Sequence, residues 1–235
     1  MMNYTPDQKR AIDSVLSIFE TGRIPTAASY ATCSILADGA GVSYGKHQCT
    51  DRAGSLDLVV KAYIKGGGKL AKELDACLPL LASNASTKVP PKGPWGPEIT
   101  NLIALLKSAG SDPIMQEAQN EVFDTNYFLP AVNHANDIGL TTALGLLTVY
   151  DTCIHSGPGG VSNIRAKFPE PSPAKGGDEK AWVRAYIAAR RKWLAGNSNA
   201  LVQKTVYRMD ALNDLAKSNN WDLALPMTVR NVKII

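Results

Sequence analysis

The segment 139–154 is almost wholly apolar, and it constrains the fold more than any other part of the chain. A helix of this length without a polar face must be covered on all sides, so we expect it to be the buried central helix of a globular protein. The glycine-rich run GPGG at 157–160 ends it. The longest membrane candidate, 140–149, contains Thr and Gly and is shorter than the roughly 20 residues that cross a bilayer. The sequence therefore predicts no stable membrane insertion.

Other segments with helical periodicity indicate a mainly α fold. Thr5, Pro6 and Gln8 form a capping box at the start of an N-terminal helix, which Gly22 ends. Short polar residues and glycines at 38–45 favour turns and a small β-hairpin, and no other run alternates clearly enough to predict a strand. Further helices are predicted over 55–64, 99–108, 113–137 and the basic segment AWVRAYIAARRKWLAG.

The 235 residues fit a single domain of two lobes. The Pro-rich stretch NASTKVPPKGPWGPE is predicted to join them, with one lobe over about 1–90 and the other over about 91–235. The four cysteines show no CxxC spacing, which argues against a metal site. We expect free thiols, with a disulfide left open, and no metal or other cofactor.

Basic residues gather in the C-terminal third of the chain. Residues 161–235 hold 13 Lys and Arg against 6 Asp and Glu, whereas residues 1–160 hold 12 against 15. Such an excess favours an anionic partner, such as nucleic acid, a lipid surface or an acidic glycan. A solvated helix face is the alternative explanation.

Two carboxylates with unlike surroundings are the strongest functional signal. Glu20 falls in the last turn of the N-terminal helix, where the negative end of the helix dipole disfavours a charged carboxylate. Asp38 follows in a loop rich in glycine, where solvent favours its charged form. Hydrolysis of a glycosidic bond needs one protonated and one ionised carboxyl group, so the pair suggests a glycosidase.

The run QEAQNEVFDTNYFLPAVNHANDIGLTTALGLLTVYDTCIHSGPGG, with NIRAKF and AARRKW after it, resembles the family 46 glycoside hydrolases, the chitosanases of the lysozyme superfamily. This resemblance implies a two-lobed, mainly α fold with a cleft between the lobes and a hairpin carrying Asp38. It also implies an inverting mechanism in which Glu20 protonates the leaving oxygen, Asp38 activates water and Ser43 positions that water. A supporting Arg–carboxylate network is implied for Asp124, Arg165 and Arg190.

Two departures from the family pattern bear on the substrate. Ala40 stands where the family has the Arg of DGRG, and Ser55 stands where it has an Asp that reads the amino group of chitosan. Asp51 and Asp57 lie close by in sequence and offer replacement carboxylates. The intervening SYGKHQ segment is similar to segments of phage and bacterial cell-wall hydrolases. Its positive charges would repel a cationic glycan.

We therefore expect a peptidoglycan hydrolase of the muramidase (lysozyme) type that cleaves β-1,4 bonds, with a chitosanase as the alternative. An inactive glycan-binding or nucleic-acid-binding module is the alternative of another class. The substrate-binding residues that we predict are Tyr30, Tyr44, Lys46, His47, Gln48, Ser55 and Trp95. Packing in the core is the alternative role of the two tyrosines.

The N-terminal residues lack a secretory signal pattern. We therefore expect a monomer that is made in the cytoplasm and acts on the cell wall after release or delivery, as a phage endolysin or an injected bacteriolytic effector would. Its predicted partner is a polysaccharide and not nucleic acid.

Overall fold

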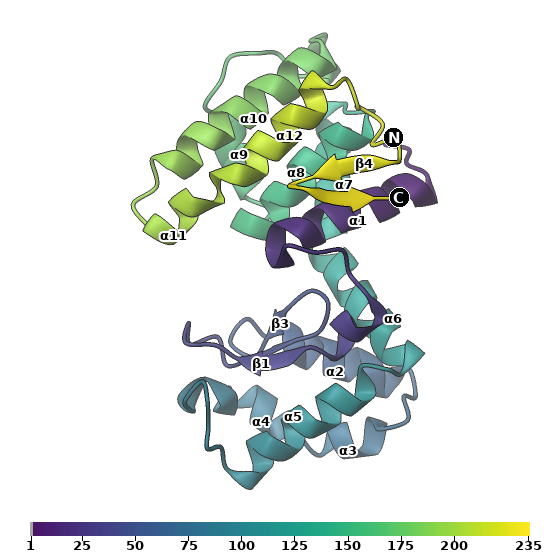
Figure 1. The fold of residues 1–235 in the computed structure, drawn as a ribbon, viewed down its shortest axis with the longest axis vertical. Helices are drawn as coiled ribbons and strands as arrows, with labels where there is room; N and C mark the ends of the chain where they lie inside the picture. The colour runs from purple at the N-terminus through teal and green to yellow at the C-terminus, as the bar shows by residue number, and fades with distance from the viewer. Residues whose placement is uncertain (1) are drawn as a thin grey trace. The chain divides into compact units, whose positions relative to one another are not determined.

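The computed structural model describes residues 2–235, and they form a mainly helical protein with two small antiparallel sheets (Figure 1). The mainly α class predicted from the sequence is confirmed. The chain divides into two compact units. Unit 1 comprises Met1–Ile24 and Asn126–Ile235, and unit 2 comprises Pro25–Thr125.

This division differs from the predicted boundary near residue 90. The N-terminal helix packs against helix α8 (Ala143–Ser156) and strand β5 (Val232–Ile234), so it belongs with the C-terminal part of the chain. The Pro-rich stretch does not join two lobes, because the helices on both sides of it pack together inside unit 2. Composition marks such a loop, but only tertiary contacts decide which elements it connects.

Unit 1 is built around helix α8, which is buried from Ala143 to Cys153 as the sequence predicts. Helices α1, α7, α9, α10 and α12 all contact it. The helix begins at Ala143 rather than at residue 139, because the Thr142 side chain caps it by accepting from the backbone N of Gly145 at 3.1 Å. The helical elements of unit 1 are α1 (Pro6–Thr21), α7 (Leu129–Ile138), α8 (Ala143–Ser156), α9 (Gly160–Arg165), η4 (Pro173–Lys175), α10 (Glu179–Ala195), α11 (Ala200–Gln203), η5 (Lys204–Val206) and α12 (Tyr207–Lys217).

Helix α1 follows the predicted capping pattern. Gln8 N donates to Thr5 Oγ1 at 3.1 Å, and Thr5 N donates to Gln8 Oε1 at 2.9 Å. Gly22 ends the helix in the left-handed conformation at φ 76°. The buried residues of α1 lie between Ala11 and Phe19. Glu20 follows directly and lies at the edge of this apolar face.

The helix predicted over 113–137 is broken. Helix α6 (Pro113–Phe123) gives way to a π-helical segment, η3 (Asp124–Phe128), before α7 starts. Pro130 explains the break, since it has no backbone N–H to continue the α-helical ladder. The two compact units also meet in sequence at this break.

Unit 1 contains a two-stranded sheet that was not predicted from the sequence. Strands β4 (Met227–Val229) and β5 (Val232–Ile234) form a hairpin. Arg230 and Asn231 between them both have positive φ, 49° and 67°, as a two-residue turn that matches the strand twist requires. Strands of three residues are too short to show an alternating pattern.

Unit 2 contains a three-stranded antiparallel sheet with the order β1-β2-β3. Alternate residues of the sheet, among them Val42 and Tyr44, face the core that helices α2 and α5 complete. The opposite face carries a row of hydroxyl residues, because Ser43 pairs with Ser34 on one side and Thr50 on the other. The elements of unit 2 are η1 (Ala27–Ala31), β1 (Cys33–Ile35), β2 (Val42–Tyr44), β3 (Cys49–Thr50), α2 (Ser55–Lys65), α3 (Ala71–Asp75), α4 (Leu78–Ala82), η2 (Ala85–Lys88), α5 (Pro97–Ala109) and α6.

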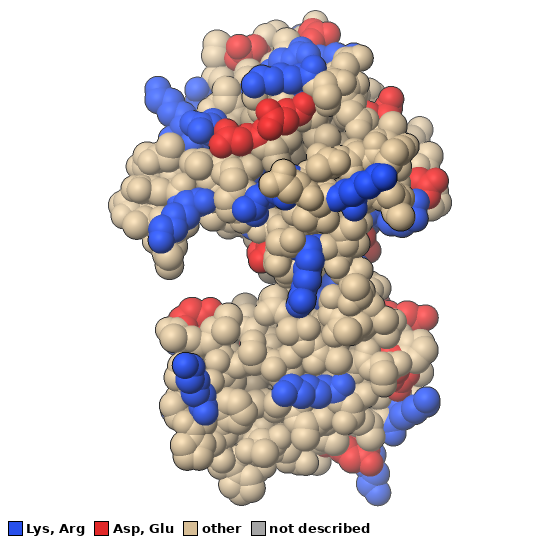
Figure 2. All heavy atoms as spheres, viewed as in Figure 1, with Lys and Arg blue, Asp and Glu red and all other residues tan. Residues whose placement is uncertain are grey.

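Three general expectations can be compared with residues 2–235. All four cysteines are free thiols. Across the described chain, no helix combines the length and the apolar character that a membrane span needs. On the face drawn in Figure 2, basic side chains are scattered and acidic side chains lie among them.

Candidate active site

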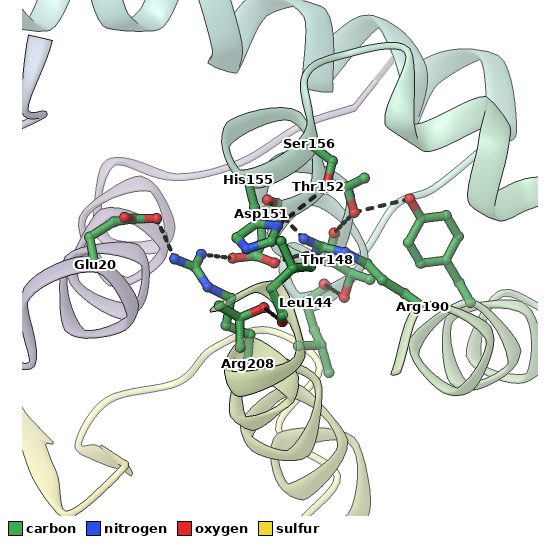
Figure 3. Close-up of polar contacts among 12 residues, drawn as sticks. Glu20, Leu144, Thr148, Asp151, Thr152, His155, Ser156, Arg190 and Arg208 are labelled. Carbon is green, nitrogen blue, oxygen red and sulfur yellow. Dashed lines mark hydrogen bonds and ion pairs between the residues drawn. The ribbon is translucent and has the colours of Figure 1, made fainter. Parts of the chain in front are cut away.

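Glu20 is held by a buried network of charged side chains in unit 1 (Figure 3). Arg208 of α12 donates through Nη2 to Glu20 Oε1, and through Nη1 to Asp151 Oδ1 at 2.7 Å. Arg190 of α10 donates through Nη1 to the second oxygen of Asp151. One carboxylate on α8 thus joins two arginines, and one of these arginines reaches the predicted proton donor.

The network is almost wholly removed from solvent. Asp151 and Arg190 are fully buried and Arg208 is 3% exposed, whereas the Glu20 side chain is 45% exposed. Burial alone would raise the pKa of Asp151, but Arg190 and Arg208 hold it below its usual range. Burial alone would lower the pKa of Arg208, but Asp151 and then Glu20 raise it. Asp151 and Arg208 are therefore both charged at neutral pH.

His155 lies one helical turn after Asp151 on α8. Burial, and then the charges of Arg208 and Arg190, lower the pKa of His155 to about 4. Its Nδ1 lies 3.2 Å from the hydroxyl of Ser156. The imidazole is therefore neutral at neutral pH, and it adds no positive charge beside the two arginines.

Asp38 belongs to unit 2, in the exposed loop between β1 and β2. Its Oδ1 accepts from the backbone N of Ala40 at 2.9 Å, which fixes the carboxylate in a tight turn. Gly39 and Gly41 have φ of 73° and 75°, a region that favours glycine. The loop needs both glycines, and this explains the composition that identified it in the sequence.

The buried hydroxyl group of Ser86 holds the end of the same loop. Ser86 Oγ accepts from Val42 N at 2.8 Å and donates to Asp51 Oδ2 at 2.5 Å. Asp51 is 2% exposed, and burial raises its pKa. Asp51 is one of the two carboxylates that the sequence offers as replacements for the family's substrate-binding Asp. In the structure it accepts hydrogen bonds from Ser86 and so helps to hold the loop.

Ser43 lies on β2, directly after the Asp38 loop, and is 3% exposed. It occupies the centre of the hydroxyl row on the sheet face that points away from the core. Its role in positioning water stays a prediction.

Several residues predicted to bind substrate make contacts within unit 2. Tyr44 is fully buried, and its hydroxyl donates to Leu106 O at 2.7 Å, so it is a core residue and not a sugar platform. Trp95 packs on the core cluster and donates from Nε1 to Pro90 O at 2.7 Å. Ser55 Oγ accepts from Thr50 N at 2.9 Å and so holds the start of α2.

The SYGKHQ segment is fixed to helix α6. Lys46 N donates to Gln119 Oε1 at 3.0 Å, and the ring of His47 stacks on Phe123 with centroids 3.8 Å apart. Gln48 Nε2 donates back to Gly45 O at 2.9 Å within the turn. The backbone of Lys46 and the side chains of His47 and Gln48 therefore make contacts within unit 2.

Tyr30 joins this cluster from η1. Its hydroxyl donates to Asn120 Oδ1 at 3.2 Å, and the same amide oxygen lies 3.2 Å from His47 Nε2. The Lys46 Nζ lies 5.7 Å from the centre of the Tyr30 ring, within reach of a cation–π contact. The structure brings three of the predicted binding residues together, and packing explains their proximity.

The supporting network is only partly the one predicted. Arg190 belongs to it, but Arg165 donates to the carbonyl oxygens of Phe168 and Glu170 at 2.7 and 2.9 Å. The carboxylate that joins the arginines is Asp151, whereas Asp124 lies half-buried in the π-helical segment of the chain.

Sequence reasoning missed Asp151 and Arg208, although one signal pointed to the first of them. Asp151 is the only charged residue within the apolar segment 139–154. Charged side chains are almost never buried without a partner, so an acid in this position predicts a buried arginine or lysine. Nothing in the sequence around Arg208 singles it out.

Comparison with known proteins gives the class of this protein. A chitosanase of Bacillus subtilis (strain 168) is 31% identical over 238 residues, covering 96% of this chain and 82% of the relative. A chitosanase of Streptomyces sp. (strain N174) is 29% identical over 197 residues, covering 79% and 66%. These relatives are glycosidases, as the paired carboxylates suggested.

Solved structures agree with the sequence relatives. The native chitosanase from Bacillus subtilis MY002 matches with a TM-score of 0.77 and 29% identity over 99% of both chains. A Gynuella sunshinyii GH46 chitosanase in complex with chitotetraose matches with a TM-score of 0.80 and 25% identity over 99% of this chain and 98% of the other. The protein is a glycoside hydrolase. Residues 14–227 match the model of Glycosyl hydrolase family 46, and the chain belongs to that family.

Proposed function

We propose that this enzyme is a chitosanase that hydrolyses β-1,4 bonds of chitosan. The observation that carries the proposal is the family match over 14–227, together with curated relatives that are all named chitosanases. A solved neighbour in complex with chitotetraose supports the same class of substrate.

The expected preference for peptidoglycan is wrong, and with it the interpretation as an endolysin or bacteriolytic muramidase. This chain matches Glycosyl hydrolase family 46, and the sequence relatives and solved structures that resemble it are chitosanases. The error came from reading the charges of the SYGKHQ segment and of the C-terminal third without their contacts in the fold. Arg190 and Arg208 are buried in ion pairs with Asp151, and Arg191 pairs with Asp210 at 2.6 Å, so part of the C-terminal positive charge is neutralised within unit 1.

The proposed mechanism uses the two carboxylates in different roles. Glu20 donates a proton to the leaving oxygen, and Asp38 accepts a proton from the attacking water, so the anomeric configuration is inverted. The tether from Arg208 supports the first role, because a proton donor must be held in one orientation. The exposed position of Asp38 on a fixed loop supports the second role.

One experiment tests the substrate. Purified protein is incubated separately with chitosan and with peptidoglycan sacculi, and the released fragments are identified by mass spectrometry. We expect chito-oligosaccharides from the first and no muropeptides from the second. Release of muropeptides without chito-oligosaccharides would overturn the proposal. The route by which the enzyme reaches its substrate stays a prediction.

A further inference from the structure

The loop that carries Asp38 has a guanidinium group lying against it. A Cβ placed on Gly39 would lie 3.2 Å from Nη2 of Arg52, and 3.6 Å from both Cζ and Nη1. Three atoms at similar distances indicate that the guanidinium covers the bare Cα of Gly39. Glycine is needed here for its positive φ of 73°, and it also leaves the space that the guanidinium occupies.

The backbone of Arg52 is fixed to the same loop. Its N–H donates to the carbonyl oxygen of Ala40 at 3.1 Å, while the N–H of Ala40 donates to Asp38 Oδ1 at 2.9 Å. Ala40 thus links the carboxylate to the residue that bears the cation. The position of Arg52 against the loop of Asp38 is therefore set by a main-chain hydrogen bond as well as by its side chain.

The guanidinium of Arg52 is open to a ligand. Arg52 is exposed, and within residues 2–235 its side chain makes no hydrogen bond or ion pair, including none with Asp38. It is also the only arginine of unit 2, since the sequence has no other between residues 25 and 125. A guanidinium has five N–H donors and cannot lose its charge. A permanent cation with unused donors therefore lies against Gly39, the residue that follows the proposed base in the sequence.

We propose that Arg52 determines which sugar unit the enzyme accepts next to the bond that it cuts, by favouring an N-acetylated unit over glucosamine there. The inference rests on the proposed chitosanase activity and on Asp38 as its base.

The two units of chitosan differ in the group at C2. Glucosamine carries an ammonium, which a nearby guanidinium repels. N-acetylglucosamine carries a neutral amide, whose carbonyl oxygen accepts hydrogen bonds from the guanidinium. Because Asp38 activates the water that attacks the anomeric carbon, the unit that Arg52 faces becomes one of the last two units at the new reducing end of the product.

The test compares Arg52→Glu with the wild type on fully deacetylated chitosan and on partially N-acetylated chitosan. We expect the wild type to give products enriched in N-acetyl units near the new reducing end, as read by tandem mass spectrometry. In Arg52→Glu, we expect the ratio of kcat/KM on deacetylated to kcat/KM on acetylated substrate to rise by about tenfold at low salt. The rise should shrink as salt is added, because screening weakens contacts between exposed charges.

Lys65→Glu is the matched control. Lys65 is an exposed cation at the end of α2 in the same unit, and its substitution makes the same change in net charge. An equal shift in both variants, or no shift in Arg52→Glu, would overturn the inference while leaving the chitosanase proposal intact. A wild-type protein that releases nothing from either chitosan would overturn the chitosanase proposal itself.

Discussion

Arg208 and Asp151 form an ion pair of 2.7 Å in the interior of unit 1, and the same arginine holds Glu20. The charge of Asp151 is balanced by two guanidinium groups, and Arg208 uses Nη1 for Asp151 and Nη2 for the proposed proton donor. The contact between Arg208 and Glu20 joins residues 188 positions apart in the sequence.

Arg208→Ala should therefore reduce both stability and turnover. Removing one member of a buried ion pair leaves an uncompensated charge and costs about 3 to 5 kcal/mol. We expect a loss of this size in urea unfolding, and a fall in kcat of about tenfold or more at a temperature where the variant is folded. Arg10→Ala, which removes an exposed ion pair with Asp7, should change both by little. Unchanged kcat in folded Arg208→Ala would show that Glu20 needs no tether.

Glu20→Gln and Asp38→Asn should each abolish turnover while leaving the fold intact. Glutamine keeps an amide oxygen that can accept from Arg208, and Asp38 is exposed, so the melting temperature should change little. Loss of a catalytic acid or base reduces kcat by about 100-fold or more.

NMR of fresh wild-type product is the companion measurement to these two variants. It should show inverted anomeric configuration. Retained configuration would contradict the water-activating role of Asp38.

The neutral state of His155 predicts a dependence of stability on pH. Its pKa is lowered to about 4 in the folded protein, against about 6.5 in an unfolded chain. Below about pH 6.5 the unfolded state binds the proton more readily, so stability is lost as the pH falls from there towards 4. We expect the melting temperature of His155→Gln to fall less than that of the wild type between pH 7.5 and pH 5. Parallel curves for the two proteins would exclude this residue as the cause.

Gly45→Ala should destabilise unit 2 more than Gly54→Ala. Both glycines have positive φ, 79° and 72°, which costs an alanine about 1 to 2 kcal/mol. A Cβ on Gly45 would also lie 2.1 Å from Gln119 Oε1, whereas a Cβ on Gly54 meets nothing within 4 Å. The displaced Gln119 would lose hydrogen bonds to Lys46 N and Tyr30 O, each worth about 1 kcal/mol. Chemical denaturation of the two variants compares them, and equal losses would argue against a role for this contact.

Local signals in the sequence predicted the local structure well. The capping box from Thr5 to Gln8 and the stop at Gly22 predicted helix α1, and the almost wholly apolar segment 139–154 predicted the buried core of α8. Each of these features depends on residues within a few positions of one another, so a single segment contains the information.

Features that depend on distant contacts could not be read in the same way. Arg208 is buried only because α12 packs against α8, and its neighbours in sequence give no sign of this. The substrate was misjudged for a related reason, since the sequence does not show which basic side chains of the SYGKHQ segment and of the C-terminal third make contacts in the fold. Arg190 pairs with Asp151, whereas the resemblance to a family implied a network for Arg190 without identifying this carboxylate.

The discontinuous make-up of unit 1 has a consequence for synthesis of the protein. Unit 2 is one uninterrupted segment, so all of the elements that pack together within it are available once residue 125 has left the ribosome. Helix α1 is made before α8 and α12, and Glu20 gains its contact with Arg208 only when α12 has been made. A nascent chain therefore gains hydrolytic competence only after Arg208 has been made, and truncation before Arg208 should leave unit 2 folded and the enzyme inactive.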